Sequence, residues 1–164
     1  MTPVSKKPEQ PAKHSPRISN RRARHEFHIL EVVEAGLALQ GTEVKSLRAG
    51  SASLEDAYVR VRGGEALLVG LNVAAYAHAG PLMQHDAKRD RKLLLHGRQV
   101  LRLAEHTRVK GNTAVPLAIY FKDGWAKCEV GLAVGKKHYD KRDAIRQRDQ
   151  KRDIAREMRR RDRK

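Results

Sequence analysis

The stretch AYVRVRGGEALLV, residues 57–69, decides the fold class of this chain. Apolar and charged side chains alternate before Gly63 and Gly64, and a second apolar run follows the two glycines. Alternation with a short glycine turn is typical of a β-hairpin. Residues 114–121 and 125–134 repeat the arrangement around a Lys-Asp-Gly turn. Strands joined by tight turns pair antiparallel, so the sequence predicts a mainly antiparallel sheet.

Other apolar patterns predict further strands. Residues 25–31 place Phe27 and Ile29 on one face of a short strand, and residues 33–39 continue it. Residues 71–76 extend the first hairpin. The expected total is about six strands.

Two helical stretches and a loop are also expected. Thr42 is a predicted helix cap, because Val44 and Leu47 follow it at helical spacing. Residues 78–92 have no apolar period and are predicted to be a loop. A second helical stretch is predicted to open at Leu93-Leu94-Leu95 and to end near Arg108.

A small antiparallel sheet with a few helices closes most economically as a barrel, which also removes exposed strand edges. The predicted fold class is therefore mainly β: an OB-like barrel of about six antiparallel strands with two or three short helices.

Charge divides the chain into three parts. Residues 136–164 hold 14 Lys or Arg against 6 Asp or Glu, a net charge of +8, and residues 1–24 hold 7 against 1, a net charge of +6. The residues between them carry only +2 of the total of +16. Cationic arms beside a nearly neutral domain are typical of a protein that binds a polyanion, and nucleic acid is the first candidate.

The predicted domains follow this division: a flexible basic arm over residues 1–19, an RNA-binding barrel over 20–135 and a basic tail over 136–164. The tail has a weak apolar stripe at Ile154 and Met158, four residues apart. An isolated helix of this kind is marginal in water. The tail is therefore expected to be disordered when free and helical when RNA matches its charge.

Several classes of protein do not fit the composition. A single cysteine, Cys128, rules out an internal disulfide and a multi-cysteine zinc site. No run of 18 apolar residues exists, so no membrane span is expected. The basic N-terminus lacks the apolar segment of a secretory signal. A cytoplasmic location is the expectation.

No arrangement of residues predicts an enzyme. His25 and His28 would point to opposite faces of a strand, and Cys128 fits a small buried side chain. Residues 131–136 resemble a phosphate-binding loop but are one residue short between the glycines, and Lys137 stands where a magnesium-binding hydroxyl belongs. We expect no catalytic residue, metal, cofactor or small-molecule substrate.

Three basic clusters favour RNA or DNA as the partner. They are Arg21-Arg22-Ala23-Arg24, Lys88-Arg89-Asp90-Arg91-Lys92 and Lys136-Lys137-His138-Tyr139-Asp140-Lys141-Arg142. Tyr139 in the last cluster could stack on a base. No helix-turn-helix or zinc spacing supports a DNA-binding role.

Four strings resemble the SsrA-binding protein family, also called small protein B, the bacterial partner of transfer-messenger RNA in trans-translation. They are NRRARHEF at residues 20–27, EAGLALQGTEVKSLR at 34–48, RKLLL at 91–95 and GKKHYDKR at 135–142. The resemblance runs from about Asn20 to the C-terminus.

The resemblance implies an OB-type barrel, one face of which binds the tRNA-like domain of transfer-messenger RNA. Glu34, Leu94 and Lys127 would lie on that face. Together with the basic clusters, the expected RNA-binding residues are Asn20, Arg21, Arg24, Glu34, Lys45, Arg48, Arg91, Lys92, Leu94 and Lys127.

The resemblance also implies that the tail enters the decoding centre and the empty messenger channel of a stalled ribosome, while the protein itself makes and breaks no bond. The expected ribosome-binding residues are Lys136, Lys137, His138, Tyr139, Asp140, Lys141, Arg142, Ile154 and Met158.

One alternative from another class stays open: a general OB-type translation or ribosome-assembly factor, which would bind many structured RNAs with similar affinity. A basic RNA-processing enzyme is a further alternative, but the sequence nominates no catalytic residue for it.

Overall fold

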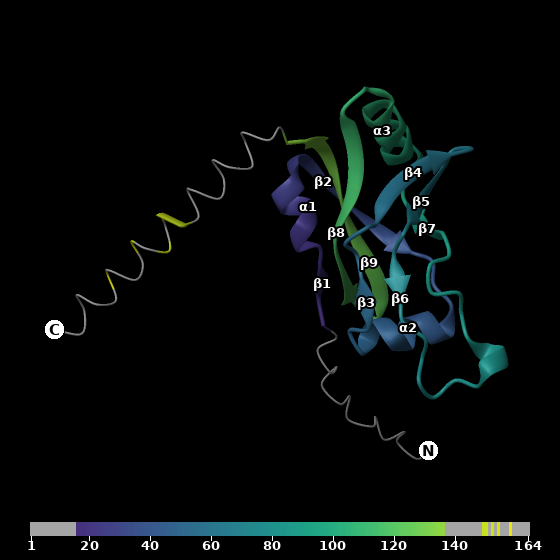
Figure 1. The fold of residues 1–164 in the computed structure, drawn as a ribbon. Helices are drawn as coiled ribbons and strands as arrows, with labels where there is room; N and C mark the ends of the chain where they lie inside the picture. The colour runs from purple at the N-terminus through teal and green to yellow at the C-terminus, as the bar shows by residue number, and fades with distance from the viewer. Residues whose placement is uncertain (1–15, 137–148, 151, 153, 155–157, 159–164) are drawn as a thin grey trace, which may run out of the picture.

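The computed structural model describes residues 16–136 and, further along the chain, residues 149, 150, 152, 154 and 158 (Figure 1). Within residues 16–136 the strands are β1 (Ile18–Ser19), β2 (Phe27–Leu37), β3 (Ala52–Ser53), β4 (Tyr58–Arg62), β5 (Glu65–Val69), β6 (Asn72–Val73), β7 (Arg91–Leu94), β8 (Asn112–Lys122) and β9 (Trp125–Gly135). The helices of the same region are α1 (Arg21–Glu26), α2 (Gly41–Arg48), α3 (Gly97–Arg108) and the 3₁₀ turn η1 (Pro81–Met83).

Seven of these strands form one antiparallel sheet in the order β1-β8-β9-β2-β7-β5-β4, and β3 pairs with β6 separately. Strand β4 at one edge also contacts β8 near the other edge, so the sheet curves back on itself. The predicted class, mainly β and antiparallel with a few helices, is confirmed. Nine strands are found in the described region rather than about six, because β1, β3 and β6 have two residues each and leave no alternation in the sequence.

Both predicted hairpins are present, and their turns explain the residues at their tips. Gly63 and Gly64 join β4 to β5 with φ of 58° and 77°, while Asp123 and Gly124 join β8 to β9 with φ of 51° and 81°. Two central residues with positive φ make the turn that matches the twist of paired strands, and Gly-Gly and Asp-Gly adopt it readily. The turns therefore set the register of both hairpins.

A bulge in β2 divides the interior into two apolar clusters. The pairing with β9 shifts between Ile29 and Glu31, so side chains beyond the bulge switch faces. Before the bulge, Phe27 and Ile29 pack near α1 in the smaller cluster. After it, Val33 and Ala35 lie in the main core.

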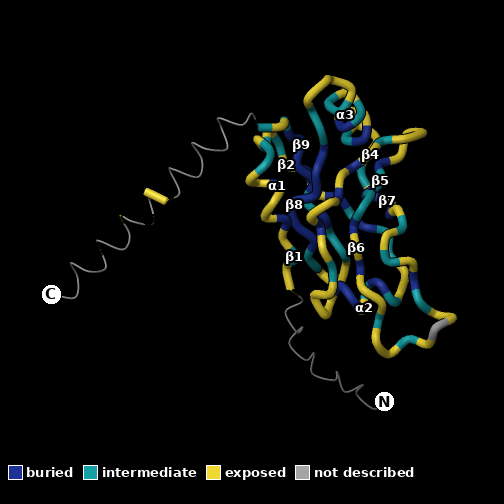
Figure 2. The backbone as a smooth tube through the Cα atoms, viewed as in Figure 1, coloured by how far each residue is buried: buried dark blue, intermediate teal, exposed yellow. Residues whose placement is uncertain are grey.

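The main core lies between the curved sheet and helices α2 and α3 (Figure 2). Helix α2 contributes Leu47 and α3 contributes Leu103, both fully buried. They pack in one cluster with Leu68, Ile119 and Val130 from three strands. Burial of this aliphatic surface is the main source of stability, at roughly 25 cal/mol per Å² of apolar area.

Helix α1 was not expected from the sequence. The prediction that a strand starts at His25 is wrong, because His25 and Glu26 are the last residues of this helix. The Asn20 side chain caps it by accepting from the Ala23 N–H at 3.0 Å. Ala23 is the only buried residue of the helix, so it leaves no apolar period. Ile18 and Ser19, included in the predicted N-terminal arm, pair with β8 as β1.

Two predictions about α2 and the first hairpin were also wrong. The cap of α2 is Gln40, not Thr42, whose hydroxyl lies 2.9 Å from His85 Nδ1. Residues 71–76 do not extend the first hairpin, because β6 pairs with β3.

The run Leu93-Leu94-Leu95 does not begin a helix. Leu93 and Leu94 end strand β7, and α3 begins at Gly97. Leu93 is buried and Leu94 is exposed, which is strand alternation hidden in an unbroken apolar run. The predicted loop over residues 78–92 accordingly ends earlier, because Arg91 and Lys92 belong to β7.

Candidate nucleic-acid interface

Strand register brings side chains from four strands onto one exposed face of the sheet. Gly36 of β2 lies opposite Leu94 of β7 and opposite Lys127 of β9, which lies opposite Tyr120 of β8. Paired residues share a face, so Leu94, Lys127 and Tyr120 project to one side. Glu34, two residues from Gly36, joins them. We call this surface the open face; its residues are Val32, Glu34, Gly36, Leu94, Tyr120, Lys122, Lys127 and Glu129.

Glu34 lies at the centre of the charges on the open face. Its carboxylate accepts a hydrogen bond from the Tyr120 hydroxyl, while Lys127 Nζ and Lys122 Nζ lie 3.8 and 3.9 Å from it. The Tyr120 hydrogen bond, and then the two lysines, lower the pKa of Glu34 below its ordinary value. The same hydrogen bond raises the pKa of Tyr120 to about 12. At neutral pH, an ionised carboxylate therefore holds a protonated tyrosine and orients two lysines.

Replacing Tyr120 with phenylalanine should raise the pKa of Glu34 toward its ordinary value, because it removes the largest cause of the shift. A carboxyl whose pKa is lowered on folding adds stability above its unfolded pKa and loses it as pH falls through the folded pKa. The variant should lose this contribution at a higher pH than the parent. Carboxyl NMR titration of both proteins tests this, with Tyr58→Phe on β4 as the control. An identical Glu34 titration in Tyr120→Phe would contradict the assignment.

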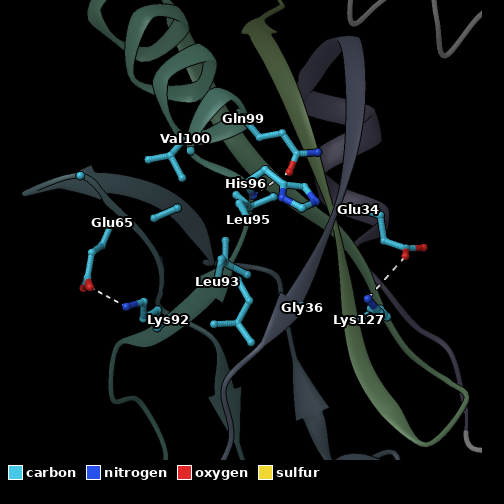
Figure 3. A pocket seen from close by; sticks show the side chains of 14 residues that line it. Glu34, Gly36, Glu65, Lys92, Leu93, Leu95, His96, Gln99, Val100 and Lys127 are labelled. Carbon is cyan, nitrogen blue, oxygen red and sulfur yellow. Dashed lines mark hydrogen bonds and ion pairs between the residues drawn. The ribbon is translucent and has the colours of Figure 1, made fainter.

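A cavity of about 630 Å³ opens beside the open face (Figure 3). Glu34 and Lys127 lie on one side of it, and residues 92–97 line the other. Lys92 points toward Glu65 of the neighbouring strand, with 2.5 Å between Nζ and the carboxylate. Both side chains are about half exposed, so an incoming phosphate can compete for Lys92.

Leu94 presents an apolar surface at the edge of this cavity. It is 54% exposed, unlike Leu93 before it, which is buried. A Cβ added at Gly36 would lie 3.2 Å from the Leu94 Cβ, so glycine lets β2 approach Leu94 this closely. An exposed leucine between cations can pack on a base or a ribose while the cations hold phosphates.

The predicted cations of α2 are exposed and lie over aromatic rings. Lys45 Nζ is 5.2 Å from the centre of the Tyr76 ring, and the Arg48 guanidinium is 5.2 Å from that of Phe121. Arg48 therefore lies beside the β8 end of the open face, whereas Lys45 points toward the loop that follows β6.

Arg21 and Arg24 are exposed on α1. This helix packs near Ala133, six residues along β9 from Lys127 and on the same face of the strand. The two arginines therefore border the open face at its far end. Lys136 joins this border, because its Nζ donates to the Arg24 carbonyl at 3.2 Å.

Two predicted RNA-binding residues are buried, so these predictions are wrong. Asn20 is 3% exposed, and its amide donates to the carbonyls of Leu54 and Pro116 while its oxygen caps α1. Arg91 is fully buried, and its Nε lies 2.9 Å from the Glu43 carboxylate. Both residues hold segments of the fold together and cannot reach a ligand.

The tail predictions fall mostly outside the described residues. Lys137, His138, Tyr139, Asp140, Lys141 and Arg142 are among those not described. Ile154 and Met158 are described, with helical backbone and exposed side chains.

Sequence reasoning missed Tyr120 on this surface and Arg17 beside it. Tyr120 binds Glu34, and Arg17 binds Glu129 at 2.6 Å while lying 5.1 Å from the centre of the Tyr120 ring. A signal for Tyr120 existed: a two-residue Asp123-Gly124 turn places it opposite Lys127. For Arg17, the only signal in the sequence was its positive charge.

Two other features are absent from the described part of the chain. It holds no cluster of three or more His, Cys, Asp or Glu side chains that could bind a metal ion. Among the same residues, no helix is long and apolar enough to cross a membrane.

Comparison with known proteins places this surface in a family context. Residues 17–160 match the family model described as SmpB protein. A protein of Pelotomaculum thermopropionicum named SsrA-binding protein is 54% identical over 142 residues, which cover 87% of this chain and 92% of the relative. The SsrA-binding protein of Staphylococcus saprophyticus is 48% identical over 150 residues, covering 90% and 97%.

A solved structure is also similar. It is described as "tmRNA-SmpB: a journey to the center of the bacterial ribosome". The similarity has a TM-score of 0.64 at 46% sequence identity and covers 80% of this chain and 95% of the other.

Proposed function

Because the chain belongs to the SmpB protein family, we propose that it is an RNA-binding adaptor that binds the tRNA-like domain of transfer-messenger RNA and delivers it to stalled ribosomes for trans-translation. The observation that carries this proposal is the convergence of Glu34, Leu94 and Lys127 on one exposed face. The resemblance independently implies that these three residues contact the RNA.

The open face offers a different contact for each part of a nucleotide. Lys122 and Lys127 neutralise phosphates, which releases counterions and drives binding. Leu94 packs against a base or ribose. Glu34 cannot bind phosphate; it accepts hydrogen bonds and keeps the two lysines in place.

The predicted RNA-binding part, residues 20–135, folds together with β1 (Ile18–Ser19) and lies between a basic arm that precedes β1 and a basic tail over 136–164. The tail occupies the decoding centre and the empty messenger channel, where its charge of +8 meets ribosomal phosphate. An intact message would fill the same space, so the tail selects ribosomes that have run out of message. The protein works in the cytoplasm and leaves peptidyl transfer to the ribosome.

Competitive binding tests this function. At about 150 mM salt, the full-length protein should prefer a tRNA-like fragment of transfer-messenger RNA over bulk tRNA and over duplex DNA. Comparable affinity for all three would mean that charge alone drives binding. The general translation or ribosome-assembly factor would then be the better description.

Replacing Lys127 with alanine should weaken binding of this fragment and reduce the slope of log affinity against log salt by about 1, because one phosphate contact is lost. The measurement is a titration at several salt concentrations. Lys45→Ala should behave alike if α2 contacts the RNA. Lys110→Ala is the matched control, since Lys110 is exposed on the turn before β8. Equal slopes for Lys127→Ala and the parent would place Lys127 off the interface.

A further inference from the structure

An apolar groove of about 510 Å³ borders the open face where β8 turns into β9. Its volume lies within the range of ordinary small-ligand sites. We call it the Trp125 groove; it is lined mainly by Gly36, Leu39, Val44, Leu94, Phe121, Trp125 and Lys127. Leu94 and Lys127 line both this groove and the cavity of Figure 3, so the two hollows meet at the open face.

Trp125 is the unusual member of this groove. It is the only tryptophan of the chain, yet 74% of it is exposed. Its partner across the hairpin is Lys122, which also reaches Glu34. A large aromatic ring exposed beside cations is poorly explained by packing, because burial would stabilise the fold more.

The charges around the groove indicate what fits there. Arg48 lies over Phe121 at 5.2 Å, Lys127 lines the wall, and Lys122 stands beside Trp125. An apolar slot with an aromatic wall and three cations at its rim complements a flat, uncharged base attached to an anionic backbone. An apolar peptide segment would pack in the slot but would have no negative charge to pair with the cations.

We infer that the Trp125 groove receives an unpaired base of the bound RNA, which stacks on Trp125 while Arg48 and Lys122 hold the flanking phosphates. This inference rests on the proposed function and deepens it, since it adds a base-binding subsite next to the phosphate-binding lysines. Stacking does not depend on the identity of the base, so the subsite recognises an unstacked nucleotide rather than a sequence.

Fluorescence reports on this subsite directly, because the emission of the chain is dominated by a single tryptophan. Saturating full-length protein with the tRNA-like fragment should quench and shift the Trp125 emission. Trp125→Ala should bind the fragment roughly tenfold or more weakly, and Trp125→Phe should recover part of the loss. The salt slope should stay unchanged in both variants, because no phosphate contact is removed.

Weaker binding by Trp125→Ala is not expected to result from a loss of folded protein. Trp125 is mostly exposed, so thermal unfolding should show that Trp125→Ala is as stable as the parent. Two results together would overturn the subsite but leave the proposed function standing. They are parental affinity of Trp125→Ala for the fragment and unchanged Trp125 emission when the parent protein is saturated with the fragment. Failure of the parent to prefer the fragment over bulk tRNA would instead overturn the proposed function. Weakened ribosome association with intact RNA affinity would assign the groove to another partner and also overturn the inference.

Discussion

Replacing Arg91 with alanine is expected to destabilise the fold by about 3–5 kcal/mol while leaving the RNA affinity of the folded protein unchanged. Arg91 and Glu43 are both fully buried, and Arg91 Nε lies 2.9 Å from the Glu43 carboxylate. Removing one partner of a buried pair leaves the other without compensation. The loss is a large part of the roughly 5–15 kcal/mol by which natural domains are stable.

The neighbourhood of Arg91 explains why the effect should be large. Its guanidinium also donates to the Leu71 carbonyl at 2.5 Å and to the Ala87 carbonyl at 3.0 Å. These bonds join β7 to the connection between β5 and β6 and to the loop between β6 and β7. Arg89 reaches the same Glu43 carboxylate from the surface at 2.5 Å. The substitution therefore breaks an ion pair and leaves buried carbonyls without donors.

The measurement is urea unfolding of Arg91→Ala beside Arg60→Ala. Arg60 pairs with Asp90 at 2.9 Å, but both side chains are more than 40% exposed, so this control should lose no more than about 1 kcal/mol. Equal stability of the two variants would refute the buried-pair account. A reduced salt slope for RNA binding by folded Arg91→Ala would show that Arg91 contacts RNA, as the sequence suggested.

Acid should act on the same network. Burial pushes the pKa of Glu43 upward, but hydrogen bonds from Arg89 and from the Gln40 N–H, with the charge of Arg91, outweigh burial and lower it. A carboxyl of this kind stabilises the fold above its unfolded pKa and loses this contribution as pH falls through the folded pKa. Glu43 is thus expected to stay ionised until the solution is more acidic than the ordinary glutamate range.

The error over Arg91 marks the limit of what the sequence could predict. Both hairpins were predictable because alternation and turn residues are local, and Asp123-Gly124 even sets Tyr120 opposite Lys127. The burial of Arg91 depends on Glu43, 48 positions away, and no local pattern reports such a contact. A basic cluster at residues 88–92 reads as surface, although Arg91 in its middle lies inside the fold.

Local patterns were likewise insufficient to predict every residue of the candidate site. Buried and exposed side chains alternate along β7, so Leu93 is buried and Leu94 is exposed. The unbroken run of leucines gave no sign of this alternation in the sequence. Asn20 caps a helix that has no apolar period, so its structural role could not be foreseen. The resemblance found Glu34, which charge alone ranks low, since a carboxylate is a poor candidate for an RNA surface.

Removing residues 137–164 should abolish tagging of stalled chains while leaving the fold and the affinity for transfer-messenger RNA largely intact. The cut follows Lys136, whose backbone N–H donates to the Glu26 carbonyl at 2.9 Å and whose Nζ donates to Arg24, so both contacts to α1 survive. The open face lies wholly within β2, β7, β8 and β9 and loses nothing.

Charge separates the two activities. The removed segment holds 13 Lys or Arg against 6 Asp or Glu, a net charge of +7. At about 150 mM salt the Debye length is roughly 8 Å, so cations beyond the RNA contact add little to specific binding. A phosphate-lined channel that surrounds the tail would interact with the whole net charge of the segment.

Two assays on the truncated and full-length proteins check this: affinity for the tRNA-like fragment at about 150 mM salt, and tagging in reconstituted translation of a message without a stop codon. A variant with Ile154→Ala and Met158→Ala keeps every charge and removes only the two exposed apolar side chains of the described helical positions. Partial tagging by this variant would assign part of the binding to apolar contact. A truncated protein that loses RNA affinity, or that still tags stalled chains, would contradict the division between an RNA-binding barrel and a ribosome-binding tail, because the same residues would then serve both partners.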